Sequence, residues 1–199
     1  MRFLSVLVVL VWTMPALADF ESDLRTCREG KPAAAALACS AVLKSGKLPT
    51  KDLASIHNER ANAYADTKRF DLAFKDYAAA IRLDPKFAHA YNNRGLTYAE
   101  LKRYAPAIRD YSEAIRLNPG FAAAFTNRAD AYVNTNRPAL ALRDYNEAIR
   151  LDPKLVLAYN NRGLLHANMK RYAPAIRDFS EAIRLHPAYK LATGDMPTR

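Results

Sequence analysis

Cys27 and Cys39 are the residues whose type and spacing first point to chemistry, and they are the only cysteines in the 199-residue chain. Two thiols can form a disulfide, serve a metal site or take part in thiol exchange. Their separation of 12 residues is not the C-x-x-C spacing of redox motifs. No histidine stands near them to help complete the four ligands of a structural metal site. We therefore expect the pair to form a disulfide.

The sequence contains no recognisable catalytic motif. The four histidines are His57, His89, His166 and His186, and none belongs to an H-E-x-x-H sequence. The chain also lacks G-x-S-x-G, a P-loop and a glycine-rich nucleotide fingerprint. We predict a protein that is not an enzyme and needs neither a cofactor nor a metal ion.

Residues 1–18, MRFLSVLVVLVWTMPALA, have the pattern of a secretory signal peptide. Arg2 supplies the positive charge, Phe3 to Trp12 is apolar, and Ala16-Leu17-Ala18 is a cleavage motif. The apolar run is shorter than the roughly 20 residues that a membrane span needs. We expect cleavage after Ala18 and a periplasmic or secreted protein, with an uncleaved anchor as the alternative. Such an oxidising compartment suits the disulfide.

The segment 19–45 is predicted to be a helical hairpin. One helical pattern runs from Glu21 to Glu29, Gly30-Lys31 turns the chain, and a second pattern runs from Ala33 to Lys44. In an antiparallel hairpin the two cysteines lie at comparable distances from this turn, so their side chains can meet. A bridge that closes so short a loop would stabilise the fold by roughly 2–3 kcal/mol.

After a linker at residues 46–53, the sequence repeats with a period of 34 residues. Four prolines and four arginines mark the period, namely Pro85, Pro119, Pro153 and Pro187, and Arg60, Arg94, Arg128 and Arg162. Each unit holds two helical patterns, and the proline ends the second because the residue before a proline is disfavoured in helical geometry. We divide the array into 54–87, 88–121, 122–155 and 156–189, followed by a tail at 190–199.

Residues at fixed places in each unit resemble the tetratricopeptide repeat family. Position 4 is large, as His57, Tyr91, Phe125 and Tyr159. Position 8 is small, as Ala61, Gly95, Ala129 and Gly163, and position 24 is aromatic, as Tyr77, Tyr111, Tyr145 and Phe179. Positions 20 and 27 are alanine in all four units. His57 at position 4 and His166 at position 11 depart from the family pattern.

The resemblance implies an all-α fold, a right-handed superhelical solenoid of helix-turn-helix repeats. One repeat cannot bury its apolar stripe alone, so stacking of repeats supplies the core. The hairpin at 19–45 would then be a degenerate first unit whose disulfide closes the end of the stack. The resemblance also implies a non-enzymatic scaffold that binds a peptide or a partner protein in a concave groove lined by the first helices.

A column of polar residues falls at the groove positions of the family. The candidate peptide-binding residues are Asn58, Asn62, Asn92, Asn93, Asn127, Asp130, Asn160, Asn161 and Asn168. Asparagine amides offer both donors and acceptors, so a repeated column can pair with the backbone of an extended peptide. The alternative is that these amides bond to neighbouring repeats or to water.

Two sets of charged pairs are predicted from the repeat. The arginines at position 7 and the aspartates at position 23 should form an ion-pair ladder between helices, in the pairs Arg60–Asp76, Arg94–Asp110, Arg128–Asp144 and Arg162–Asp178. On the exposed face, i, i+4 spacing predicts the pairs Arg109–Glu113, Arg143–Glu147 and Arg177–Glu181.

The formal net charge of +10 keeps a second function open, the binding of nucleic acid or an anionic envelope surface by the basic convex face. The aromatic residues fall at core positions, which argues against stacking on nucleic acid bases. We therefore expect a protein partner, no nucleic acid and no stable membrane span. Self-assembly through the C-terminal end is a third alternative.

Overall fold

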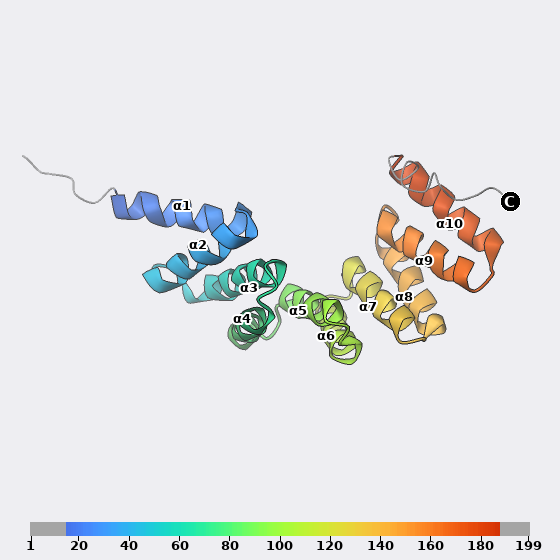
Figure 1. The fold of residues 1–199 in the computed structure, drawn as a ribbon, viewed down its shortest axis with the longest axis horizontal. Helices are drawn as coiled ribbons and strands as arrows, with labels where there is room; N and C mark the ends of the chain where they lie inside the picture. Colours follow the sequence, from blue (N-terminus) through green and yellow to red (C-terminus); the bar gives the residue numbers. More distant parts are fainter. Residues whose placement is uncertain (1–14, 188–199) are drawn as a thin grey trace, which may run out of the picture. The chain divides into compact units, whose positions relative to one another are not determined.

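The computed structural model of the protein describes residues 15–187, which fold into ten α-helices with no strand among them (Figure 1). The expected signal peptide lies mostly, and the tail at 190–199 entirely, outside the described residues. Within this described part, no helix has both the length and the apolar composition that a membrane crossing needs. The helices belong to two compact units, which divide between Asp84 and Pro85.

The first unit contains four helices that pack in chain order. They are α1 (Pro15–Glu29), α2 (Pro32–Ser45), α3 (Thr50–Asp66) and α4 (Phe70–Leu83). The hairpin expected at 19–45 is present as α1 and α2, although α1 begins at Pro15 and not at Glu21. The linker expected at 46–53 is shorter than predicted, because α3 already begins at Thr50. Pro49 has an extended backbone just before this helix. Asp52 lies in the first turn, where its negative charge interacts favourably with the positive end of the helix dipole.

The second unit contains three helix pairs. They are α5 (Ala88–Glu100) with α6 (Tyr104–Leu117), α7 (Ala122–Asn134) with α8 (Pro138–Leu151), and α9 (Val156–Asn168) with α10 (Tyr172–Leu185). Each helix packs against the next, and α7 also contacts both α5 and α9. The first helices of successive repeats therefore lie side by side within this unit, and every second helix ends at an extended residue that precedes a proline, as expected.

The core of each repeat is built from small residues around one aromatic ring. In α6, Ala107, Tyr111 and Ala114 have at most 1% of their surface exposed. A β-carbon built on Gly95 would lie 2.7 Å from Cε1 of Tyr111, so the first helix approaches this ring more closely than an alanine would allow. Gly163 has the same relation to Phe179, at 2.9 Å. Small residues at position 8 thus set the distance between paired helices.

The turn between the helices of each repeat contains one residue in the left-handed conformation. These residues are Lys68, Lys102, Asn136 and Lys170, with φ of 61°, 56°, 56° and 58°. Glycine and asparagine adopt this conformation readily, whereas a lysine does so at an energetic cost. Three of the four turns therefore place a lysine in a backbone conformation that is unfavourable for it.

Candidate interaction surface

The predicted ladder of ion pairs is confirmed in all four repeats. In each pair the arginine donates from Nε to one carboxylate oxygen, at 2.7 or 2.8 Å, and from Nη2 to the other. The four aspartates are buried, at 4–7% exposed. Such two-point pairing matches the fork of the guanidinium to the carboxylate and holds the two helices of a repeat in register.

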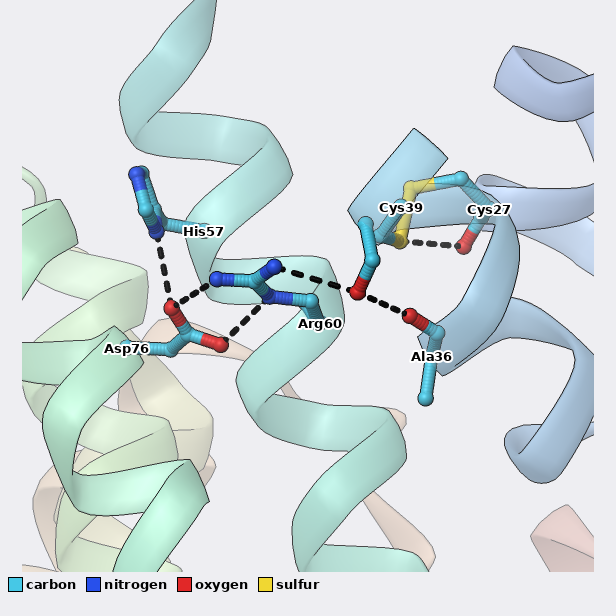
Figure 2. A network of polar contacts seen from close by, with 7 residues as sticks. Cys27, Ala36, Cys39, His57, Arg60 and Asp76 are labelled. Carbon is cyan, nitrogen blue, oxygen red and sulfur yellow. Dashed lines mark hydrogen bonds and ion pairs between the residues drawn. A yellow bond between two sulfur atoms is a disulfide. The ribbon is translucent and has the colours of Figure 1, made fainter. Parts of the chain in front are cut away.

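In the first unit a histidine joins this ladder. Figure 2 shows Asp76 between His57 and Arg60, with His57 Nδ1 2.8 Å from Asp76 Oδ1. Burial raises the pKa of Asp76, but hydrogen bonds from His57 and Arg60 outweigh it and hold the pKa below its usual value. Arg60 also donates from Nη1 to Ser40 Oγ, at 3.1 Å, and so links α3 to α2. His57, which departs from the family pattern, is therefore a structural residue.

The same arginine position links successive repeats in the second unit. Arg128 Nη1 donates to Ser112 Oγ of α6 at 3.0 Å, and Arg162 Nη1 donates to Asn146 Oδ1 of α8 at 2.6 Å. One guanidinium therefore contacts both its own second helix and the preceding one. This role is structural, because the guanidinium is already engaged by the protein itself.

The prediction of exposed i, i+4 pairs is wrong, because each glutamate pairs with a different arginine. The glutamates bond instead to the arginine three residues later, in Glu113–Arg116, Glu147–Arg150 and Glu181–Arg184, each at 2.6 Å. A glutamate N-terminal to its basic partner has the favourable orientation on a helix, whereas the predicted pairs had the reverse order. The arginines at 109, 143 and 177 are exposed without forming these pairs.

The two cysteines meet in the first unit, as the hairpin predicts. Cys27 of α1 and Cys39 of α2 are joined with their sulfur atoms 2.05 Å apart (Figure 2). Both are at most 2% exposed and pack with Val42 and Ile56. The bridge therefore lies inside the core that the hairpin shares with α3.

The candidate asparagines divide into buried and accessible groups. Asn58 and Asn92 at position 5 are only 3% and 5% exposed, and Thr126 at the same position is 1% exposed. Asn92 Oδ1 accepts from Asn127 Nδ2 at 2.9 Å, which joins α5 to α7. For Asn58 and Asn92, the alternative of bonding to neighbouring residues fits the structure better than direct contact with a ligand.

The amides at positions 5 and 6 form short chains along the first helices of the second unit. Asn92 donates to Asn93 Oδ1 at 3.3 Å, and Asn160 donates to Asn161 Oδ1 at 3.2 Å. Asn161 in turn donates to both carboxylate oxygens of Asp130, at 3.0 and 3.2 Å. These contacts bring the predicted residues of neighbouring repeats together on α5, α7 and α9.

Position 9 has a second role that sequence reasoning missed. The hydroxyl of Tyr77 donates to Asn62 Oδ1 at 2.8 Å, and the hydroxyl of Tyr145 donates to Asp130 Oδ1. In the other two repeats position 9 is leucine, and there position 8 is glycine. A polar residue at position 9 together with tyrosine at position 24 was the signal available in the sequence.

Asn62 also takes part in a polar group of the first unit. Burial raises the pKa of Glu59, and hydrogen bonds from Asn58 and Asn62 oppose that effect. Two of the predicted binding residues of this unit thus serve an acidic side chain and, in the case of Asn62, a tyrosine hydroxyl as well. The first unit has a polar first-helix surface, but much of it is internally bonded.

A pocket of about 360 Å³ opens beside Asp130 in the second unit. Asp130, Tyr145 and Asn161 contribute its polar wall, and Asn168 also lines it. Burial raises the pKa of Asp130, while hydrogen bonds from Tyr145 and Asn161 partly oppose that rise. Four of the predicted or newly found polar residues therefore converge on one hollow between α7, α8 and α9.

A second hollow, of about 780 Å³, lies against α7 and α8 and is lined by arginines. Arg128 and Arg150 there are paired with Asp144 and Glu147, and Arg143 is exposed. The basic residues at positions 22 and 29 are exposed in all four repeats, as predicted for a solvated face. Of these eight residues, the arginines at 116, 150 and 184 each pair with a neighbouring glutamate.

His166 lies partly buried on α9, as its core position predicts. Its Nδ1 atom has no hydrogen-bond partner among the described residues, and burial lowers the pKa of the ring. The equivalent position is tyrosine in the other three repeats. Among the described residues, no group of three or more side chains that could hold a metal ion is found.

Comparison with known proteins identifies the repeat. The model of the tetratricopeptide repeat matches residues 88–121 and 156–189, and a related TPR repeat model matches 61–102 and 139–170. A comparison with curated proteins finds no match.

Solved structures of proteins named MamA have the same fold. A form described as MamA 41-end from Desulfovibrio magneticus is 18% identical, with a TM-score of 0.72, and the match covers 87% of this chain and 96% of that chain. Another crystal structure of MamA is 21% identical, with a TM-score of 0.70 and coverage of 85% and 96%. The paired helices and the residues at the small and aromatic positions agree with the repeats that the family models match. The chain belongs to the tetratricopeptide repeat family.

Proposed function

We propose that the protein is a scaffold that holds an extended segment of a partner protein against the first helices α5, α7 and α9. The observation that carries the proposal is the set of asparagines on these three helices that are not buried, among them Asn93, Asn127 and Asn168. Membership of the family supports a protein-interaction scaffold in general terms. The groove and the extended ligand are the finer part of the proposal.

Several amide groups on this surface have bonding capacity left for a ligand. Asn127 and Asn160 donate to neighbouring residues, but their own Oδ1 atoms have no partner among the described residues. Asn168 is exposed beside the pocket. Carbonyl oxygens of this kind accept from the N–H groups of an extended backbone, whatever side chains that backbone carries.

The sequence pattern of the N-terminus supports a proposal for the compartment. We propose export, cleavage after Ala18 and a periplasmic or secreted location. A disulfide between Cys27 and Cys39 is consistent with that address, because such bonds persist in oxidising compartments. The partner is then a protein or peptide of the same compartment.

Two other functions receive support from particular features. Exposed arginines at 109, 143 and 177 would serve an anionic ligand. Tyr172 and Ile176 on α10 are each 64% exposed and would serve self-association near the C-terminal end. The asparagine surface is favoured over both because hydrogen bonds between repeats bring its polar residues together on α5, α7 and α9.

Crosslinking and capture from the native compartment tests the proposal. The groove variant is Asn127→Ala, Asn160→Ala and Asn168→Ala, and its matched control is Arg109→Ala, Arg143→Ala and Arg177→Ala on the exposed basic face. We expect a partner that is recovered with the wild type and the control but lost with the groove variant, while circular dichroism is unchanged. Loss with the arginine variant alone would reject the groove and favour the anionic ligand. Equal recovery with all three proteins would also reject it.

A further inference from the structure

Asp130 is a half-buried carboxylate that no basic residue in the described part of the chain neutralises. Its oxygens accept from the Tyr145 hydroxyl and the Asn161 amide. Among the described residues, no lysine, arginine or histidine forms an ion pair with it. Every aspartate of the ladder, by contrast, has an arginine bonded to both of its oxygens. Among the described residues, Asp130 therefore differs from the four buried aspartates of the ladder in lacking a cation.

The hydrogen bonds that reach Asp130 leave part of its capacity unused. An ionised carboxylate can accept about four hydrogen bonds. Tyr145 supplies one, and the single Asn161 nitrogen lies near both oxygens and supplies at most two. Oδ2 in particular has only the longer contact of 3.2 Å with Asn161. An additional donor from outside the protein can bind there.

The pocket beside Asp130 has the form that a long basic side chain needs. Val133, Leu164 and Leu165 give it an apolar wall, which suits a chain of methylene groups. Asn134 and Asn168 add amides, and none of the residues that line the pocket is basic. The pocket therefore combines apolar surface with one negative group, and nothing in its wall competes for that group.

We propose that this pocket receives a lysine or arginine side chain of the partner segment, with the cationic group bonded to Asp130. The proposal rests on the proposed function, and it names the one side chain that the surface selects. A charge-assisted hydrogen bond in a partly desolvated pocket is stronger than a neutral one. The equivalent residues of the other repeats are Asn62, Leu96 and Leu164, so the basic side chain would also fix the register of the bound segment.

The environment of the carboxylate agrees with this assignment. Burial raises the pKa of Asp130, which means that the folded protein holds the ionised carboxylate at a cost. A bound cation lowers that cost. Asn62 shows that a neutral amide satisfies the tyrosine of the same repeat position, since it accepts from Tyr77 at 2.8 Å. A negative charge is thus not required for packing.

The test uses n-butylammonium, which has the length and charge of a lysine side chain, with n-butanol as its neutral counterpart. The full protein is titrated and the side-chain amide signals of Asn134, Asn161 and Asn168 are followed by NMR. Asp130→Asn removes the charge and keeps an acceptor for Tyr145, as Asn62 does for Tyr77. Glu113→Gln, which removes an exposed carboxylate elsewhere in the same unit, is the control for net charge.

We expect saturable shifts with n-butylammonium, none with n-butanol, binding weakened at least about tenfold by Asp130→Asn, and no change with Glu113→Gln. Equal shifts with the alcohol, equal binding by Asp130→Asn, or no shifts in the wild type would overturn the site. If the site fails while the groove variant still loses its partner, only the selection of a basic side chain is rejected. If n-butylammonium binds but capture does not depend on the groove, the proposed function fails and the cation site stands.

Discussion

At the scale of single residues, the ladder arginines hold carboxylates that the fold has removed from water. Changing Arg128 to leucine leaves Asp144, whose side chain is 6% exposed, without its cation. Removing one partner of such a pair is much more costly than removing both, because a buried charge remains uncompensated. We expect Arg128→Leu to lower the free energy of unfolding by roughly 2–4 kcal/mol, measured by chemical denaturation.

The double variant Arg128→Leu with Asp144→Leu is the matched control. It should be less destabilised than the single variant, because no unpaired charge is left in the interior. Unchanged stability in the single variant would mean that the ladder contributes nothing to the fold, contrary to the role assigned to it here.

Asp130 should show the opposite behaviour from Asp76 of the ladder, whose pKa is lowered. Its pKa is raised in the folded protein, so folding favours its protonated form. The free energy of unfolding therefore falls as the pH rises from the ordinary aspartate pKa through the folded pKa. At neutral pH the full cost of holding the ionised carboxylate in the folded protein is present. We expect Asp130→Asn to stabilise the protein by about 1 kcal/mol at pH 7, with the gain disappearing below the ordinary aspartate pKa of about 3.9. Thermal unfolding of both proteins as a function of pH measures this, and a gain that persists in acid would contradict the cause.

At the scale of elements, a substitution in the turn within a repeat can raise the stability of the protein. Lys102 has φ of 56°, a conformation that glycine adopts without penalty. We expect Lys102→Gly to stabilise the protein by about 0.5–1 kcal/mol in denaturant unfolding. Lys75→Gly, inside α4, should destabilise by a similar amount, because glycine is unfavourable in a helix. If both changes were destabilising, strain in the turn would not be the relevant quantity.

The closeness of paired helices is tested at position 8. A β-carbon on Gly95 would lie 2.7 Å from the Tyr111 ring, which is 1% exposed and has little room to move. Gly95→Ala should therefore destabilise the protein by about 1–3 kcal/mol through overpacking, as measured by thermal unfolding. Gly120→Ala, where a β-carbon would have only a 3.4 Å neighbour, is the control and should change little. A neutral Gly95→Ala would show that the helices separate easily.

The period of the sequence was sufficient to predict the helix pairs and the ladder, because both depend on residues repeated at fixed places. It did not predict where individual hydrogen bonds end. Asn92 and Asn93 are adjacent in the sequence, yet only the structure shows that Asn92 is buried and bonded to Asn127 of the next repeat. The exposed pairs failed for a related reason, since Glu113 can reach an arginine on either side along its helix.

At the scale of the whole molecule, the disulfide belongs to one of two compact units. Replacing both Cys27 and Cys39 by alanine should destabilise the first unit by roughly 2–3 kcal/mol, because the bridge limits the unfolded chain. Amide hydrogen exchange should rise in α1 and α2 and stay unchanged in α7 to α10. Leu37→Ala, at a position of α2 that is 75% exposed, is the control for a change in the same helix. Equal protection before and after removal of the bridge would contradict the prediction.

The bonding of the side chains on the candidate surface could not be predicted from the sequence alone. The groove positions were predicted from the resemblance, but their chemistry depends on which side chains already bond to one another. Asp130 illustrates this, since only its contacts with Tyr145 and Asn161 show that it lacks a cation. Asn62 occupies the same place in the first repeat and carries no charge.

The near identity of two repeats has a consequence for how the chain finds its fold. Both α6 and α10 contain the sequences YAPAIRD and SEAIRL, and both α5 and α9 contain YNNRGL. The partners α6 and α10 therefore offer α5 almost the same side chains, and contact energy does little to tell them apart. Chain connectivity decides, because closing the loop at 101–103 costs far less entropy than closing the one at 101–171. Two chains at high concentration lose that distinction in part, so exchange of helix pairs between molecules is the misfolding route to which this array is most exposed.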